Sequence, residues 1–444
     1  MFYIDKNTEL TSALLQKMLN RFNFNYLPNL EKWKNYFDGK HAILNKTYTD
    51  ENKPCNRIIT NYCRVITETY SGYLAGKPIT YTSNNDIGPI QEVINYNDDN
   101  SENISWLTNA LIYSVGYELT WLDKNSQVRY SQISPLNAFP IYSNTLEGEL
   151  LYFVRWYKND NFDDTDLYHL EVYSANSVKH YRMHGLLGNL EFIEEVPHYF
   201  KDVPVSVFNL NENNISIFDS IITLNDAYNE LQSSEVDEWQ EFVDSYLSLT
   251  GCDADEEDIK SMKENRVLLL PEGSSAGWVT KSTSDQQIEN MLSNIRKNIF
   301  KVAACPDMSD SEFMAQSGVA IAYKIVNFEN AASSIVSRFE KAIQRRLELI
   351  CNIINIKGGE STWRDVRINF VRNLPVNTTE VIQLVNSLQG IVSNKTLLSQ
   401  IPFVDDVDAE LEAVAKQKEE NMSLYSFGLH EHTEEDPEEE DEEI

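Results

Sequence analysis

The chain has 444 residues, of which 42% are hydrophobic and 24% charged, and its formal net charge at pH 7 is −32. A chain of this length exceeds what one hydrophobic core usually serves, so the sequence predicts two or more folded domains. A body this acidic does not grip nucleic acid by neutralising phosphates, although it could surround nucleic acid without holding it.

The N-terminal part of the chain is predicted to form helices. Within 56–78, apolar residues recur at three- and four-residue steps, which places them on one face of a helix. Asn56 is suited to cap the start of this helix, and Gly76 followed by Lys77-Pro78 ends it. Further amphipathic helices are expected over residues 8–22, 28–38, 88–96 and 103–116.

Between about 117 and 210 the hydrophobic pattern changes to alternation. Runs such as LLYFVRWYK and LYHLEVYS are rich in β-branched and aromatic residues, and turn-like breaks such as Asn159-Asp160-Asn161 separate them. These features are typical of an antiparallel sheet. We expect either a small barrel or a sandwich.

Three long helices are predicted next, over residues 218–249, 285–304 and 319–355. The first would be about 48 Å long at the usual helical rise. Between the first two, residues 266–282 are typical of two strands joined by a Gly/Ser turn. Two long helices separated by so little chain cannot both bury an apolar stripe within one compact globule. We therefore expect these stripes to pack against neighbouring copies of the chain.

The C-terminal part is predicted to contain a strand within 366–377 and two helices, over 378–399 and 405–420. Residues 421–444 are acidic and poor in apolar side chains, so we expect them to be disordered. The predicted fold class is therefore α+β, mainly α, with long helices and a β-rich domain.

The search for chemistry finds no complete site. The run GYLAGKP (72–78) resembles a phosphate-binding loop, but it has one residue too few between its glycines and Pro78 where magnesium would need Ser or Thr. His180 and His184 flank a turn, where no helical ligand geometry holds. The acidic run 252–258 lacks the central glycine and the terminal glutamate of a calcium loop, which leaves solvated loop charge or weak cation binding. No catalytic, cofactor-binding or metal-binding residue is assigned.

The location of the protein is expected from what the sequence lacks. The N-terminal residues do not have the basic start and apolar run of a signal peptide, and no apolar stretch approaches the roughly 20 residues of a membrane span. The five cysteines form no CxxC pair, which is typical of a reducing cytosol. We expect a soluble protein without a disulfide framework or a zinc ribbon.

Four runs resemble the portal proteins of tailed bacteriophages, in the branch of phages with long, non-contractile tails. They occur in family order and are spread over most of the chain, although nothing in 123–200 matches. The four runs are NRIITNYCRVITETYSGYLAGKPITY (56–81), LNDAYNELQSSEVDEWQEFVDSYLSLTG (224–251), CPDMSDSEFMAQSGVAIAYKI (305–325) and INFVRNLPVNTTEVIQLVNSLQGIVSNKTLLSQIPFVDD (368–406).

The resemblance implies a ring-forming subunit with the family's named parts. Portal subunits form a ring, usually of twelve, at one vertex of the capsid. The implied parts are a wing (1–217), a stem of two helices (218–249 and 285–305), a clip (250–284), a tunnel loop (306–318), a long helix with a returning wing strand (319–377), a helical crown (378–420) and a disordered acidic tail (421–444).

The same resemblance implies contact residues. Those expected to touch DNA from the tunnel loop, or otherwise to pack against the next subunit, are Met308, Phe313, Met314 and Gln316. Those expected to face the channel from the stem, or otherwise to form salt bridges with a neighbour, are Arg296, Lys297 and Lys301. Those expected to dock the packaging motor and the adaptor at the clip are Arg266, Glu272, Trp278 and Lys281.

The expected partners are further copies of the chain, double-stranded DNA passing through the channel, the terminase large subunit, the major capsid and scaffold proteins, and the head-completion (adaptor) protein. The expected location is the portal vertex of the virion, after assembly in the host bacterial cytoplasm, with no membrane contact. Two other hypotheses remain open. One is a DNA-processing enzyme, either a nuclease or a packaging ATPase, and the other is a minor capsid or scaffold protein that forms no channel.

Overall fold

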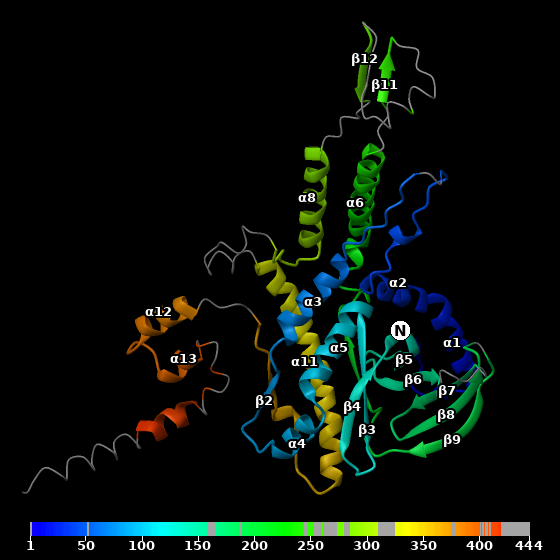
Figure 1. Ribbon diagram of the computed structural model, residues 1–444. Coiled ribbons are helices and arrows are strands. Elements are labelled where there is room, and N and C mark those ends of the chain that lie inside the picture. Colours follow the sequence, from blue (N-terminus) through cyan, green and yellow to red (C-terminus); the bar gives the residue numbers. More distant parts are fainter. Residues whose placement is uncertain are drawn as a thin grey trace, which may run out of the picture. The chain divides into compact units, whose positions relative to one another are not determined.

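The computed structural model is shown in Figure 1. It describes residues 2–50, 53–158, 166–186, 188–243, 247–251, 273–278, 285–309, 325–373, 378–399 and 410–418, with the single residues 260, 401, 404 and 407. The chain divides into two compact units. The first comprises Met1–Gln316 and Ile321–Asn373, and the second comprises Ser317–Ala320 and Leu374–Ile444.

The first unit begins with a short strand and a helical layer, as the sequence predicts for most of this region. Its helices are α1 (Ser12–Asn25), α2 (Leu27–Phe37), α3 (Tyr62–Ala75), α4 (Gly88–Tyr96) and α5 (Asp99–Tyr113), with a 3-10 turn η1 (Ala42–Asn45). The predicted start of α3 is wrong. Asn61, not Asn56, caps α3 by accepting a hydrogen bond from the Arg64 amide, and the preceding residues are extended.

The predicted antiparallel sheet region forms two sheets. A six-stranded sheet has the order β1 (Phe2–Ile4), β5 (Ala138–Ser143), β6 (Leu150–Lys158), β7 (Leu167–Tyr173), β8 (Ser177–His184) and β9 (Glu191–Pro197). A three-stranded sheet has the order β10 (Val205–Asn209), β3 (Val115–Leu122) and β4 (Val128–Ile133), and a 3-10 turn, η2 (Pro135–Asn137), leads from β4 to β5. All neighbours are antiparallel except β1 and β5, and the sequence did not predict that parallel N-terminal strand.

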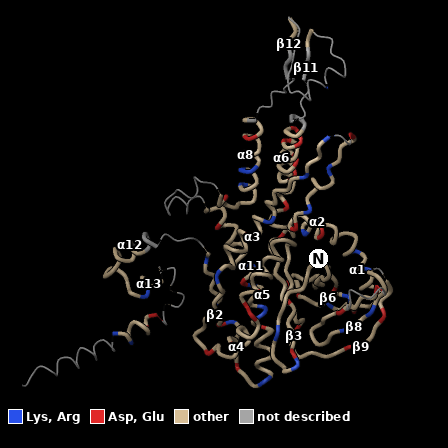
Figure 2. Tube along the Cα trace, viewed as in Figure 1, with Lys and Arg blue, Asp and Glu red and all other residues tan. Residues whose placement is uncertain are grey.

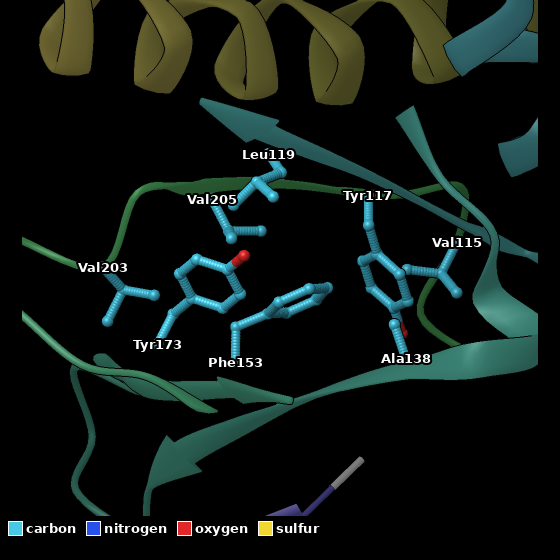
Figure 3. Packing of buried hydrophobic residues seen from close by; sticks show 8 residues of the cluster. All are labelled: Val115, Tyr117, Leu119, Ala138, Phe153, Tyr173, Val203 and Val205. Carbon is cyan, nitrogen blue, oxygen red and sulfur yellow. The ribbon is translucent and has the colours of Figure 1, made fainter. Parts of the chain in front are cut away.

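The two sheets pack face to face over a hydrophobic core, which Figure 3 shows. Tyr117 of β3 meets Phe153 of β6 edge to face, with ring centroids 5.2 Å apart, and Tyr173 of β7 and Val205 of β10 complete the layer. Of the two forms predicted for this region, the described residues form the sandwich, because each sheet keeps its own open edges.

The long helix α11 (Val326–Ile356) packs against β10 and α4. Its 31 residues extend about 46 Å. Phe339 stacks on Phe208 of β10 with ring centroids 4.8 Å apart, and Trp106 of α5 meets Phe339 edge to face. After a 3-10 turn, η4 (Trp363–Asp365), strand β13 (Arg367–Asn369) pairs with β2 (Thr80–Thr82), which joins the chain after α11 to the segment after α3.

The helices α6 (Ile222–Val243) and α8 (Asp285–Val302) pack against each other, and a 3-10 turn, η3 (Asp219–Ile221), precedes α6. The prediction of one helix over 218–249 is wrong at its end. Leu247–Thr250 is a strand, β11, antiparallel to β12 (Ser275–Trp278). The run LSLT alternates apolar and small polar residues, which suits a strand, and its backbone groups pair with β12. The first predicted strand of 266–282 lies outside the described residues.

The second unit contains α12 (Thr378–Leu388), α13 (Asn394–Leu398) and a helical stretch over 410–418. The prediction of one helix over 378–399 is wrong, because the chain turns between α12 and α13. Gly390 has φ +85°, a left-handed conformation that ends a helix, and the Ser393 side chain then caps α13 by accepting from the Thr396 amide. The predicted disordered tail, 421–444, lies outside the described residues.

Candidate functional site

A row of four polar side chains follows one face of α6, and we call it the polar ladder. The ladder residues are Asn225, Asn229, Ser233 and Asp237, all buried. Each accepts a hydrogen bond from a backbone amide of the extended segment that leads into α3. In order, the donors are the amides of Tyr62 (3.2 Å), Thr60 (2.9 Å), Ile58 (2.9 Å) and Asn56 (2.6 Å).

The ladder forms because the two backbones have nearly equal repeats. Four helical residues rise about 6.0 Å. Two extended residues rise about 6.6 Å, and alternate amides of an extended segment point the same way. One ladder side chain per turn therefore meets every second amide of residues 56–62. Without these acceptors the largely half-buried amides would lack a partner within the fold, at a cost of up to about 1–3 kcal/mol each.

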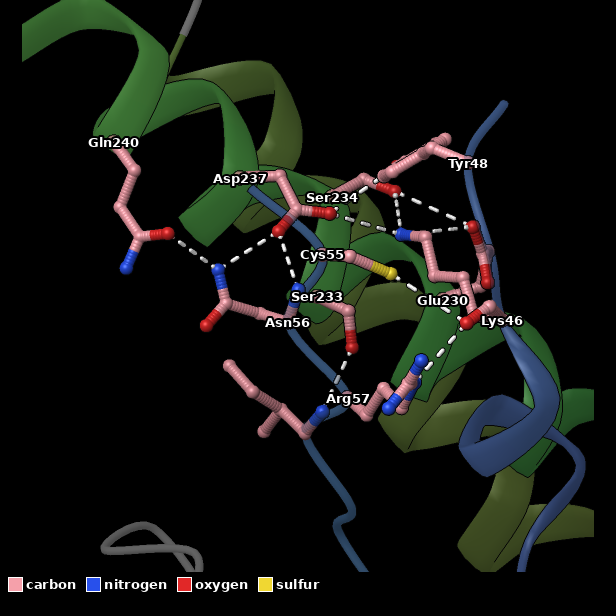
Figure 4. A network of polar contacts seen from close by, with 11 residues as sticks. Lys46, Tyr48, Cys55, Asn56, Arg57, Glu230, Ser233, Ser234, Asp237 and Gln240 are labelled. Carbon is pink, nitrogen blue, oxygen red and sulfur yellow. Dashed lines mark hydrogen bonds and ion pairs between the residues drawn. The ribbon is translucent and has the colours of Figure 1, made fainter. Parts of the chain in front are cut away.

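A charged cluster closes the Asp237 end of the ladder (Figure 4). One carboxylate oxygen of Asp237 accepts from the backbone and the side chain of Asn56, and the other accepts from Lys46 at 3.2 Å and Tyr48 at 3.1 Å. Burial opposes ionisation of Asp237, but these hydrogen bonds outweigh it and lower its pKa. Lys46, with 8% of its side chain exposed, also lies 3.2 Å from Glu230. The loop before α3 is thus fixed to α6 by charge as well as by backbone hydrogen bonds.

A neutral histidine supports the middle of the ladder. The side-chain amide of Asn229 donates to Nδ1 of His41 (3.1 Å), and Nε2 of His41 donates to the Tyr36 carbonyl (3.0 Å). Burial lowers the pKa of His41, so the uncharged ring is the stable form. One ladder residue therefore joins three segments: α6, the extended segment and the turn after α2.

A second polar network lies under α11. The Arg346 guanidinium is fully buried and forms two hydrogen bonds with Glu118 of β3, at 2.8 and 2.5 Å, and one with Asp99 of α5, at 2.6 Å. Tyr81 of β2 and Tyr130 of β4 each donate a hydroxyl to Asp99. Burial raises the pKa of Glu118, and the Arg346 charge opposes that rise. The network therefore joins α11 to α5, to β3 and β4 of the three-stranded sheet, and to β2.

Sequence reasoning missed both networks. Polar residues at every fourth position of an otherwise apolar helix are the available signal for the ladder. Arg346 lies in the predicted apolar face of a long helix, where a single charge is the available signal. In each case the partners lie more than 150 residues away along the chain.

The predicted stem residues are described by the structure. Arg296 pairs with Asp307 of its own chain in a two-bond fork, at 2.7 and 2.9 Å, and also contacts the Ser309 hydroxyl. Burial opposes ionisation of Asp307, but Arg296 and Ser309 lower its pKa. Lys297 and Lys301 are exposed. Arg296 thus joins the second predicted stem helix to the first residues of the predicted tunnel loop.

The other predicted contact residues are only partly described. Met308 is exposed. Trp278 lies in β12, opposite Leu247 of β11. Those that lie outside the described residues are Phe313, Met314, Gln316, Arg266, Glu272 and Lys281.

No metal site or membrane helix emerges from the described part of the chain. Among those residues no group of three or more His, Cys, Asp or Glu side chains is arranged to hold a metal ion. The helices of that part are also too short or too polar to cross a membrane. The hydrogen bonds of the ladder and the charged cluster join α6 to the segment before α3, and those of the Arg346 network join α11 to β3 and α5.

Comparison with known proteins identifies the family. The family described as phage portal protein, SPP1 Gp6-like, matches residues 17–424. The chain is similar to the portal protein of Clostridium phage phiCD119, with 20% identity over 435 residues that cover 90% of this chain and 95% of the relative. It is also similar to the portal protein of Bacillus phage SPP1, with 21% identity over 424 residues that cover 89% and 81% of the two chains.

The chain belongs to the SPP1 Gp6-like family of phage portal proteins. This confirms the resemblance on which the sequence predictions rest. The family is structural rather than enzymatic, and membership makes the chain a component of a phage capsid with a portal function.

Proposed function

We propose that this chain is the repeating subunit of a ring, formed by twelve copies, through which double-stranded DNA enters and leaves the capsid at one vertex. The observation that carries the proposal is the pair of packed helices α6 and α8 in a chain that matches the portal family along most of its length. The ladder holds α6 against residues 56–62, and Arg296 holds α8 against Asp307. The chain itself performs no catalysis, and ATP hydrolysis comes from a separate terminase.

The parts of the proposed ring are assigned along the chain as the family resemblance implies. The stem is α6 and α8, and the wing comprises the elements before α6 together with β13. The clip is the chain between the stem helices, including the β11–β12 pair. The tunnel loop is 306–318, and the crown is 378–420. The clip docks the terminase large subunit during packaging and the head-completion protein afterwards, with Arg266, Glu272, Trp278 and Lys281 as its contact residues. The major capsid and scaffold proteins surround the ring during assembly in the host cytoplasm.

Charge supports a conduit rather than a DNA clamp. Twelve copies at −32 each give a formal charge of about −384, which repels DNA from the wall and prevents deep binding minima. The helix α6 has acidic residues and no Lys or Arg, whereas α8 carries Arg296, Lys297 and Lys301 (Figure 2). Arg296 is already paired with Asp307. The stem cations that remain for DNA, or for α6 of a neighbouring subunit, are therefore Lys297 and Lys301.

The tunnel loop supplies the closest contacts with DNA. Its candidate residues are Met308, Phe313, Met314 and Gln316. The exposed Met308 follows Asp307, which is fixed to α8, so this residue begins the loop from a defined position.

Imaging of the purified full-length chain tests the proposal. We expect rings with a central hole in negative-stain micrographs, and DNA packaging when the rings are supplied to procapsids with the terminase and ATP. A chain that stays monomeric at every protein and salt concentration would refute the ring. Rings without a hole would favour a minor capsid or scaffold role. ATPase or nuclease activity of the pure chain, lost on substitution of one carboxylate, would favour the enzyme instead.

A further inference from the structure

The C-terminal end of α8 is held by a side chain from α3. The last carbonyls of a helix lack partners within the helix. The Tyr70 hydroxyl, on a fully buried side chain, donates to the carbonyls of Ala303 (3.0 Å) and Ala304 (3.3 Å). Ala304 has φ +49°, a left-handed conformation that residues other than glycine seldom adopt unless their surroundings hold them there. Tyr70 therefore fixes the point at which the chain leaves α8.

The N-terminal end of α11 is held by the same helix. The Phe328 ring packs against Tyr70 and Tyr73, with ring centroids 4.7 and 4.6 Å apart. The Tyr73 hydroxyl donates to Glu329, which also accepts from Arg372 at 3.0 Å. Tyr70 and Tyr73 lie three residues apart on α3 and so share one face.

The two tyrosines thus join three helices. Ordinary core packing would use the rings alone. Here the Tyr70 hydroxyl donates to two main-chain carbonyls at the end of α8, one of them that of the left-handed Ala304. The Tyr70 ring also contacts Phe328 at the start of α11. The helix α3 is itself fixed to α6 by the ladder, because Tyr62, the first residue of α3, donates its amide to Asn225.

We propose that Tyr70 and Tyr73 form a clamp that sets the distance between the end of α8 and the start of α11, and that DNA passage requires this fixed distance. The two tyrosines are positioning residues, since neither is placed in the channel. The role in DNA passage rests on the proposed portal function. The clamp itself is a property of the single chain.

Spin labels on the two clamped helix ends test the clamp. Val302 of α8 and Val326 of α11 are both exposed, so V302C and V326C can carry labels in the full-length chain, with Cys55 and Cys252 replaced by serine. Pulsed electron paramagnetic resonance then gives the distance distribution between the labels. We expect one narrow distribution for the parent chain. Tyr70→Phe keeps the ring on Phe328 but removes the hydroxyl, and we expect it to add a broad component.

The expected size of this component follows from the lost hydrogen bond. One such bond corresponds to a rise of about fivefold in the released population. Tyr173→Phe is the matched control, because it also removes a buried hydroxyl, the one that donates to Glu171 of the same strand β7, in the sheet core and away from the two helix ends. This control should keep the narrow distribution. Tyr73→Phe gives a second test, since it removes the hydroxyl that donates to Glu329 and leaves the α8 carbonyls bonded.

Packaging measurements separate the clamp from the ring. We expect Tyr70→Phe to form rings as the parent does and to package less DNA per ring, whereas Tyr173→Phe should package as much DNA as the parent. A distance distribution unaltered by Tyr70→Phe and by Tyr73→Phe overturns the clamp. A broadened distribution with normal packaging overturns its role in DNA passage. If the parent chain forms no ring, the portal function fails, while the distances in the single chain still decide whether the clamp exists.

Discussion

The substitution Arg346→Met tests the network under α11. Methionine has a similar length and no charge, so it leaves Glu118 without its bidentate partner and Asp99 without one of its four donors. Removing one partner of a buried ion pair typically costs about 3–5 kcal/mol, because the remaining charge stays buried and unpaired. Tyr81, Tyr130 and Asn103 still donate to Asp99, so Glu118 is the carboxylate that carries most of this cost.

Urea unfolding followed by tryptophan fluorescence measures the change. The Arg346 guanidinium lies 5.0 Å from the Trp106 ring, so the transition of this region has a local probe. Arg345→Met is a matched control on the same helix. Arg345 pairs with Asp202 and Glu348, but its side chain is 22% exposed and the pairs are solvated, so the cost should be about 0–1 kcal/mol.

The pH dependence of the variant gives a second reading. Burial already raises the pKa of Glu118, and loss of the opposing Arg346 charge raises it further. A carboxyl whose folded pKa lies above its unfolded value destabilises the fold at pH values above the unfolded pKa. The loss in free energy of unfolding caused by Arg346→Met should therefore become smaller as the pH falls through the folded pKa of Glu118. Equal losses for Arg346→Met and Arg345→Met at neutral pH would refute the reasoning.

Four further predictions concern the ladder, the stem and the tail. Ser233→Ala leaves the half-buried Ile58 amide without an acceptor, so the free energy of unfolding should fall by about 1 kcal/mol and exchange of this amide should be faster than in Ser234→Ala, measured by hydrogen–deuterium exchange. His41 has a lowered pKa, so stability should be lost as the pH falls from about 6.5 toward the folded pKa, and this slope should be absent from His41→Phe in unfolding titrations. Arg296→Gln should leave rings intact but increase protease cleavage after α8, whereas Lys297→Gln should not, because Arg296 holds Asp307 and Lys297 is exposed. Deletion of 430–444 should leave rings unchanged in micrographs, because this acidic run cannot bury a core.

Local patterns predicted most elements of the fold. The three- and four-residue periodicity located α3, α8 and α11, and alternation located the sheet region. The errors occur where non-local pairing or a single backbone conformation decided the structure. The end of α6 depends on pairing with β12, and the break after α12 depends on the left-handed Gly390. Periodicity along one segment contains neither kind of information.

The candidate site was harder to predict than the fold, because its contacts are side chain to backbone across long separations. Nothing in Ile58 or Thr60 itself shows that their amides are donated to a helix, since every extended residue has such an amide. The ladder becomes visible only when α6 and residues 56–62 are placed together, with matching repeats. The same holds for Tyr70, whose residue type predicts burial but not that its hydroxyl holds the end of another helix.

The run 56–81, which carries the first portal-like pattern, also joins several elements of the first unit. Its extended part donates amides to α6, its helix α3 holds the ends of α8 and α11, and Tyr81 at its end donates to Asp99 beside Arg346. A subunit that lines a moving polymer must keep its helices in register while the contents of the channel change. Hydrogen bonds to main-chain groups fix that register whichever side chains the helices present to the channel or to their neighbours. In the proposed ring, one short segment would therefore hold α6, α8 and α11 while their outer surfaces contact DNA and partner proteins.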